Sequence, residues 1–98
     1  MPEVRLLPKA YEDLENIWRY TIEQWGTEQA ITYVDELNAA FKRLADNPLL
    51  NRERSEFSPP VRIVPYGSHL IVYLAEERGI TIIRVLHESM DAGTQISD

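Results

Sequence analysis

The stretch that decides the fold is Ile80-Thr81-Ile82-Ile83-Arg84-Val85-Leu86-His87-Glu88-Ser89-Met90-Asp91. Its first half is a near-continuous apolar run, which is typical of a strand covered on at least one face. Arg84 interrupts the run, and burying its charge is costly unless it has a partner or a solvent-exposed side. His87 follows where the strand leaves the sheet, and histidine titrates near neutral pH. The stretch therefore leaves two roles open, catalysis at a strand end or recognition of a partner.

Two more apolar segments precede this strand. Residues 61–64 and 69–75 predict strands, and the Pro65-Tyr66-Gly67-Ser68 segment between them has turn chemistry. Residues 76–79 predict a hairpin loop in which Gly79 is free to take a positive φ. Residues 49–60 form a largely polar loop that is long for a compact domain, and such loops are often functional.

The N-terminal half predicts a strand followed by two helices. Glu3–Leu7 is a short candidate strand that ends at Pro8, and proline is tolerated in the first turn of a helix. Apolar residues then recur at three- and four-residue steps up to Gly26, which is expected as a left-handed cap. Thr27 is expected as the N-cap of a second helix that Asn47-Pro48 ends. The short connection makes the two helices antiparallel neighbours.

The side chains of these helices divide into an apolar face and an acidic face. The helical spacing of four large aromatic residues favours the core over a ligand pocket. The acidic residues of the first helix are expected on a solvated face, because their spacing fits no metal site. The aromatic set is Trp18, Trp25, Tyr33 and Phe41, and the acidic set is Glu12, Asp13 and Glu15.

The predicted element order is β-α-α-β-β-β, which places the chain in the α+β class. The helical hairpin should pack on one face of a small, mainly antiparallel sheet that the N-terminal strand joins. The other face of the sheet is expected to be partly open, with Arg62, Tyr73 and Arg84 on it. Residues 1–91 are expected to form a single domain, and residues 92–98 a short flexible tail.

Composition narrows the classes of function. The 98 residues carry a formal net charge of −6, which argues against direct nucleic-acid binding because phosphate contacts dominate that affinity. The chain contains no cysteine, so disulfides, thiolate metal sites and thiol nucleophiles are excluded. We expect a cytoplasmic protein with no cofactor and no metal, since the sequence has no membrane-length apolar run and no glycine-rich phosphate loop. All five bases of residues 49–91 are arginines, which suit carboxylate or phosphate partners.

Residues spread along almost the whole chain, from about Val4 to Asp91, match a known family in order and spacing. The sequence resembles the ParE branch of the RelE/ParE superfamily of toxins from type II toxin–antitoxin modules. The last block, Ile83 to His87 followed by Met90 and Asp91, is the strongest part of the match. The earlier matching positions are Ala10, Asp13, Leu14, Ile17, Tyr20, Trp25, Gly26, Ala30, Tyr33, Leu37, Phe41, Leu44, Ala45, Pro48, Val61, Arg62, His69, Ile71, Val72 and Tyr73.

The resemblance implies a toxin that a small, ParD-like antitoxin neutralises in a hetero-oligomeric complex. The ParE branch is associated with inhibition of DNA gyrase, so the resemblance favours a toxin that blocks replication by binding. The antitoxin is expected to bring an amphipathic helix and an extended segment onto the hairpin and sheet. The residues predicted to contact the target or the antitoxin are Arg52, Arg54, Arg62, Tyr73, Arg84, His87, Met90 and Asp91.

Two alternatives remain open at this stage. The related RelE branch cuts messenger RNA on the ribosome, and His87, Arg84 and Arg62 are the residues that could do so here, with His69 or Glu88 as a second proton carrier. The acidic balance and the absence of lysine after Lys42 argue against this activity, as does the three-residue spacing that points Arg84 and His87 to opposite faces. The other alternative is an inactive relative that binds only its antitoxin.

Three alternative roles are open for His87. It is either a structural residue that bonds the backbone or Asp91, part of the surface that contacts the target or the antitoxin, or a nuclease base.

Overall fold

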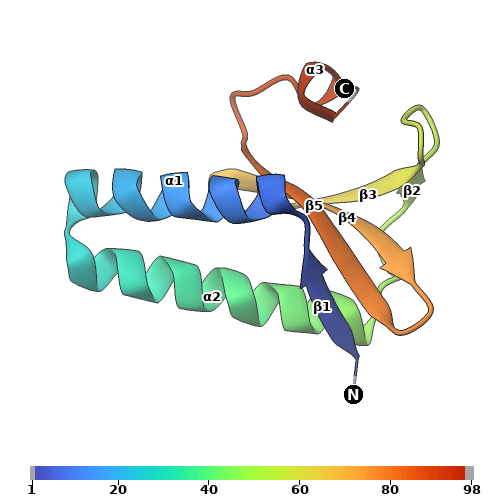
Figure 1. Ribbon diagram of the computed structural model, residues 1–98, viewed down its shortest axis with the longest axis horizontal. Helices are drawn as coiled ribbons and strands as arrows, with labels where there is room; N and C mark the ends of the chain where they lie inside the picture. Colours follow the sequence, from blue (N-terminus) through green and yellow to red (C-terminus); the bar gives the residue numbers. More distant parts are fainter. Residues whose placement is uncertain (1, 97–98) are drawn as a thin grey trace.

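The computed structural model describes residues 2–96 and contains three helices and five strands within them. In chain order these are β1 (Glu3–Leu6), α1 (Pro8–Trp25), α2 (Thr27–Asp46), β2 (Glu53–Arg54), β3 (Val61–Tyr66), β4 (His69–Glu76), β5 (Gly79–His87) and α3 (Ala92–Ile96). Figure 1 shows α1 and α2 as a long antiparallel hairpin beside the sheet, and α3 beyond the end of β5. The predicted α+β class, with a helical hairpin on one face of the sheet, is confirmed.

The sheet has the strand order β1-β5-β4-β3-β2, with β1 parallel to β5 and the other neighbours antiparallel. β5 is therefore a central strand, in agreement with its apolar sequence. Its register against β4 shifts once, because Arg84 lies opposite Val72 while Ile82 lies opposite Tyr73. Ile83 is the extra residue of this β-bulge, which changes the face to which the following residues of β5 point.

The main core lies between the hairpin and the sheet. Leu37 and Phe41 of α2 and Ile17 of α1 pack on side chains of β4 and β5, and each fully buried side chain of this size contributes about 1.5–3 kcal/mol. A second, smaller cluster lies on the opposite face of the sheet. It consists of Val61, Val72 and Leu86, with Phe57 and two residues of α3 packed against it.

The structure corrects several details of the sequence prediction. The loop 49–60 contains the two-residue strand β2, which pairs with the start of β3. β3 continues through Pro65, because β2 covers only its first two residues and Pro65 lies on an open edge, where a missing N–H breaks no ladder bond. The cap of α2 is Gly26, not Thr27, and it has a φ of 93°.

Two predictions about exposed and mobile parts are also wrong. Trp25 is 71% exposed instead of buried, because it is the last residue of α1 and nothing packs beyond it. Residues 92–96 of the expected flexible tail form α3, whose Ala92 and Ile96 pack on the second cluster. Residues 97–98 of that tail lie outside the described residues. Within residues 2–96, no helix combines the length and hydropathy that a membrane span requires.

Gly79 supports a testable prediction about the contact between β1 and β5. A Cβ atom built on Gly79 would lie 1.9 Å from the backbone oxygen of Glu3, whereas one on Gly26 meets nothing within 4 Å. Gly79→Ala should therefore lower the free energy of unfolding by about 3 kcal/mol or more, because backbone must move. Gly26→Ala should cost only the strain of its backbone conformation, about 1–3 kcal/mol, with no backbone clash added. Urea denaturation measures both, and equal losses would contradict the close approach of β1.

Candidate functional site

Arg84 forms a nearly buried ion pair with Asp13 of α1. The guanidinium Nε and Nη2 donate to the two carboxylate oxygens of Asp13 at 2.8 and 2.9 Å, a bidentate arrangement. The side chains of Arg84 and Asp13 are only 14% and 12% exposed. This hydrogen bonding to Asp13 raises the pKa of Arg84 further above its ordinary value, so the guanidinium stays charged.

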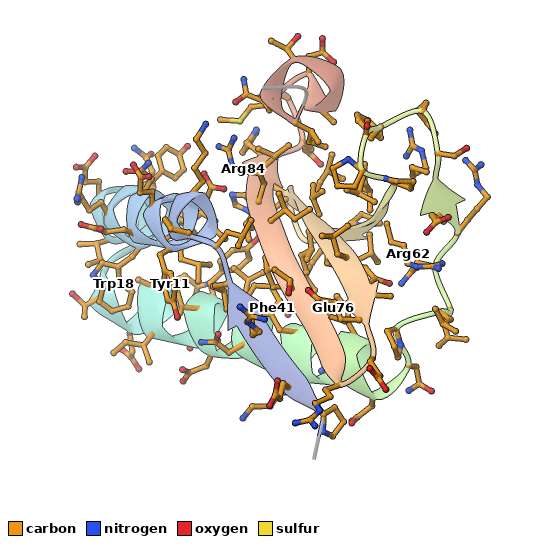
Figure 2. All side chains as sticks on the ribbon, turned by 45° about the vertical axis from the view of Figure 1, so that its right-hand side comes forward. Tyr11, Trp18, Phe41, Arg62, Glu76 and Arg84 are labelled. Carbon is orange, nitrogen blue, oxygen red and sulfur yellow. The ribbon has the colours of Figure 1, made fainter. Side chains whose placement is uncertain are left out.

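Asp13 also replaces a missing strand at the edge of β5. β1 pairs with β5 only as far as Ile82, because the chain then turns at Leu7 into α1. On this side of β5 no strand reaches Val85, and its backbone N–H donates to the Asp13 carboxylate at 2.9 Å. Arg84 reaches in the other direction to the carbonyl oxygen of Gln95 in α3, at 3.4 Å. Arg84 and Asp13 thus join α1, β5 and α3 at one point, which Figure 2 shows beside α1 and below α3.

These contacts correct the expected position of Asp13. The prediction that Asp13 lies on a solvated face with Glu12 and Glu15 is wrong, because Asp13 is the carboxylate partner that Arg84 requires. The signal was the cost of an unpaired arginine in an apolar strand, which demands a carboxylate somewhere in the fold. The sequence did not indicate which of sixteen acidic residues would supply it.

Both histidines of the chain meet at the end of the sheet where β4 begins and β5 ends. His69 and His87 are directly opposite in the register, and their rings stack edge to face with centroids 5.5 Å apart. The Nδ1 atom of His69 lies 2.7 Å from the hydroxyl of Tyr33 on α2. The Nδ1 atom of His87 accepts the backbone N–H of Ser89 at 3.1 Å and lies 2.7 Å from the Ser89 hydroxyl.

His87 therefore bonds Ser89, and not Asp91. Asp91 instead receives the N–H of Gly93 and the hydroxyl of Thr94 at the start of α3. Because Arg84 lies opposite Val72 and His87 opposite His69, the two side chains point to opposite faces of the sheet, as their spacing predicts. Arg84 and His87 do not converge on one site.

Burial shifts the pKa values of His69 and Tyr33. Desolvation, followed by the nearby charge of His87, lowers the pKa of His69 below its ordinary value, while Glu88 and Asp13 act in the opposite direction. Desolvation raises the pKa of Tyr33. Near neutral pH, a neutral His69 and a protonated Tyr33 hydroxyl share one short contact.

A cavity of about 300 Å³ opens beside the two histidines, between α1 and β5. Ile17 and Val85 are buried at its floor, and Tyr20 and Met90 are exposed at its rim. Asn16 completes the wall on the α1 side, next to Asp13. Within residues 2–96 this cavity brings two of the predicted site residues, His87 and Met90, to one place.

The other predicted site residues are distributed elsewhere. Tyr73 is 0% exposed and donates to the carbonyl oxygen of Pro48 at 3.0 Å, so its predicted place on an open face is wrong. Arg62, opposite Tyr73 in the register, is also on the helix side, where it donates to the carbonyl oxygen of Asn51. Figure 2 shows Arg62 and Arg84 far apart on the molecule.

The last two predicted arginines lie in the loop around β2. Arg54 pairs with Glu56 at 2.8 Å and lies over the ring of Phe57, while Arg52 is exposed. Neither arginine lines the cavity beside the histidines.

Comparison with known proteins assigns the family. Residues 4–92 match the model of the ParE toxin of type II toxin–antitoxin systems. The chain belongs to the ParE toxin family. It is 41% identical to the toxin ParE1 of Mycobacterium tuberculosis over 87 residues, covering 88% of this chain and 89% of the relative. It is 38% identical to the toxin ParE1 of Caulobacter vibrioides over 92 residues, covering 94% and 95%.

A solved structure of the chromosomal ParDE toxin–antitoxin system from P. aeruginosa shares the fold. It superposes with a TM-score of 0.73 at 21% identity and covers 89% of this ParE toxin and 96% of that chain. The resemblance noted in the sequence is therefore confirmed at the level of family and fold.

The Asp13–Arg84 pair leads to a prediction on stability. Asp13→Ala should lower the free energy of unfolding by about 3–5 kcal/mol, because it leaves a nearly buried guanidinium without its partner. Glu15→Ala is the matched control on the same helix. Its ion pair with Arg19 is exposed, so the loss should be at most about 1 kcal/mol. Chemical denaturation measures both variants, and similar losses would show that the Asp13–Arg84 pair adds nothing beyond a surface pair.

The lowered pKa of His69 leads to a prediction on pH. The folded protein binds a proton at His69 less readily than the unfolded chain, so stability from neutral His69 is present above about pH 6.5. This stability is lost as the pH falls from there through the lower folded pKa. Between roughly pH 7.5 and pH 5, which spans this titration, the thermal midpoint of the unchanged protein should fall further than the thermal midpoint of His69→Gln. Parallel curves for both proteins would contradict the shift.

Proposed function

We propose that this ParE toxin inhibits DNA gyrase, and so replication, by binding, and that a ParD-like antitoxin neutralises it in the cytoplasm. The observation that carries the proposal is the engagement of Arg84 by Asp13. A nuclease needs cations that converge on a phosphate next to its acid and base. Arg84 leaves β5 on the opposite face from His87 and is engaged by the carboxylate of Asp13, and Arg62 lies under the loop that follows α2.

The exposed apolar residues of the hairpin support a protein partner. Tyr11 and Trp25 of α1 are exposed, as is Ile31 of α2. Figure 2 shows Tyr11 and Trp18 on the same side of α1. Exposed aromatic residues aligned along a helix are typical of surfaces that receive an amphipathic partner helix.

The free edge of β1 supports the extended part of the same partner. β1 is a terminal strand of the sheet, so its outer backbone groups are open to pairing. A groove of about 590 Å³ runs beside it, between Val4 and Leu6 of β1 and Asn38 and Lys42 of α2. We propose that the extended segment of the antitoxin adds to β1, while its helix covers the aromatic residues of α1.

One observation favours the alternative of an mRNA endonuclease. His69 and His87 are adjacent, and a pair of histidines is able to act as base and acid. The Nδ1 atoms of both rings are already engaged by Tyr33 and Ser89, and no arginine lines the adjoining cavity. This arrangement supplies proton carriers without a phosphate site, so the binding mechanism has the stronger support.

The proposed function predicts the outcome of two assays on one protein and one variant. The purified toxin should inhibit supercoiling by DNA gyrase, and His87→Ala should weaken that inhibition without abolishing it, because His87 transfers no proton in a binding mechanism. Primer extension on an induced transcript should show no new cuts. Site-specific cuts that disappear with His87→Ala would contradict the proposal and establish the endonuclease. Normal growth after induction without an antitoxin would instead identify an inactive relative.

A further inference from the structure

The cavity between α1 and β5 is lined in a way that suits the binding of one apolar side chain. Its floor is formed by Ile17 and Val85, which are 7% and 3% exposed. Its rim carries Tyr20 and Met90, which are 60% and 45% exposed although they are large and apolar. An apolar concavity with exposed aromatic and methionine side chains around it is typical of the anchor site of a protein interface.

His87 adds a hydrogen-bond donor to the cavity wall. Since its Nδ1 accepts the N–H of Ser89, the ring proton lies on Nε2, at the opposite edge of the ring. Because His87 lines the cavity, this N–H is a donor suited to an acceptor of the occupant, such as a backbone carbonyl beside the anchored side chain. The contact with Ser89 and the stacking on His69 hold the ring in place before any partner binds.

The charge around the cavity selects the flanking residues of the occupant. The cavity lining contains no lysine or arginine, and the guanidinium of Arg84 nearby is neutralised by Asp13. Glu12 and Glu88 are exposed outside the cavity lining, and their negative charges act to raise the pKa of Arg84 and of His69, respectively. A segment with lysine or arginine on either side of its apolar anchor is complementary to this rim.

The cavity lies on a different side of α1 from the surface proposed for the antitoxin. Tyr20 follows Trp18 by two residues, which is a rotation of about 200° around a helix with 3.6 residues per turn. β1 pairs only with the first half of β5, from Gly79 to Ile82, whereas Val85 and His87 in the other half of β5 line the cavity. The cavity is continuous instead with the end of β5 and with Met90.

We propose that this cavity holds an apolar side chain of the gyrase segment to which the toxin binds, flanked by basic residues and hydrogen-bonded to Nε2 of His87. The inference rests on the proposed function, because it names the part of the target that the toxin recognises. The hydrogen bond is one contact among several, so the apolar anchor supplies most of the affinity.

Filling the cavity tests the inference directly. Asn16 is exposed and lines the cavity, so Asn16→Trp should occupy it without disturbing the core. Gln24→Trp is the matched control, an exposed neutral residue of α1 outside the cavity. The concentration of toxin needed to inhibit supercoiling by purified gyrase should rise by about tenfold or more for Asn16→Trp, and stay unchanged for Gln24→Trp.

A second variant tests the same inference if Asn16→Trp fails to fold. Met90 is exposed, and Met90→Lys removes apolar rim surface and places a cation where basic flanking residues are expected. It should also weaken inhibition by several-fold, on the order of 1 kcal/mol, while circular dichroism shows the same thermal midpoint as the unchanged protein.

The outcomes separate the two proposals. If the unchanged toxin inhibits gyrase, and Asn16→Trp and Met90→Lys inhibit it equally well, the cavity is not a target site. This result would leave the proposed function intact. No inhibition by the unchanged toxin would overturn both. Weaker inhibition by the two cavity variants alone would support both.

Discussion

The carboxylate of Asp13 is the point on which the arrangement of helices and sheet depends. β1 must end at Leu6 so that the chain turns into α1, and this leaves the second half of β5 without a strand on its β1 side. Asp13 accepts the N–H of Val85 and the Nε and Nη2 donors of Arg84, so one side chain completes the edge of the strand and neutralises the charge of Arg84. A buried charge and an unpaired backbone N–H would each be costly alone.

This contact also determines where the proposed binding surfaces lie. It fixes α1 against β5, and the cavity with Ile17 and Val85 at its floor lies directly beside it. The bulge at Ile83 is equally necessary, because it turns Val85 and His87 toward the helices. The arginine that would be needed for phosphate chemistry serves the fold instead. The surfaces that remain are apolar and acidic, which favours recognition of a protein over cleavage of RNA.

Much of the fold could be predicted from the sequence because its signals are local. Pro8, Gly26 and Pro48 bound the two helices, and the apolar periods are long and regular. The errors have non-local causes. Trp25 has the spacing of a core residue but lies at the end of its helix, and Tyr73 is buried because Pro48 and Asn51 meet its hydroxyl. The partner of Arg84 is 71 residues away, and no local pattern marks it. The pairing of His69 with His87 required the register of β4 against β5.

The central claim is that Arg84 stabilises the fold and takes no part in binding gyrase, and one variant tests it. In Asp13→Asn with Arg84→Met, the asparagine oxygen still accepts the N–H of Val85, and neither side chain carries a charge that lacks a partner. If Arg84 serves only the fold, this double variant should fold and inhibit gyrase supercoiling at the same concentration as the unchanged toxin. A folded double variant that no longer inhibits gyrase would contradict this claim and place Arg84 in the functional surface.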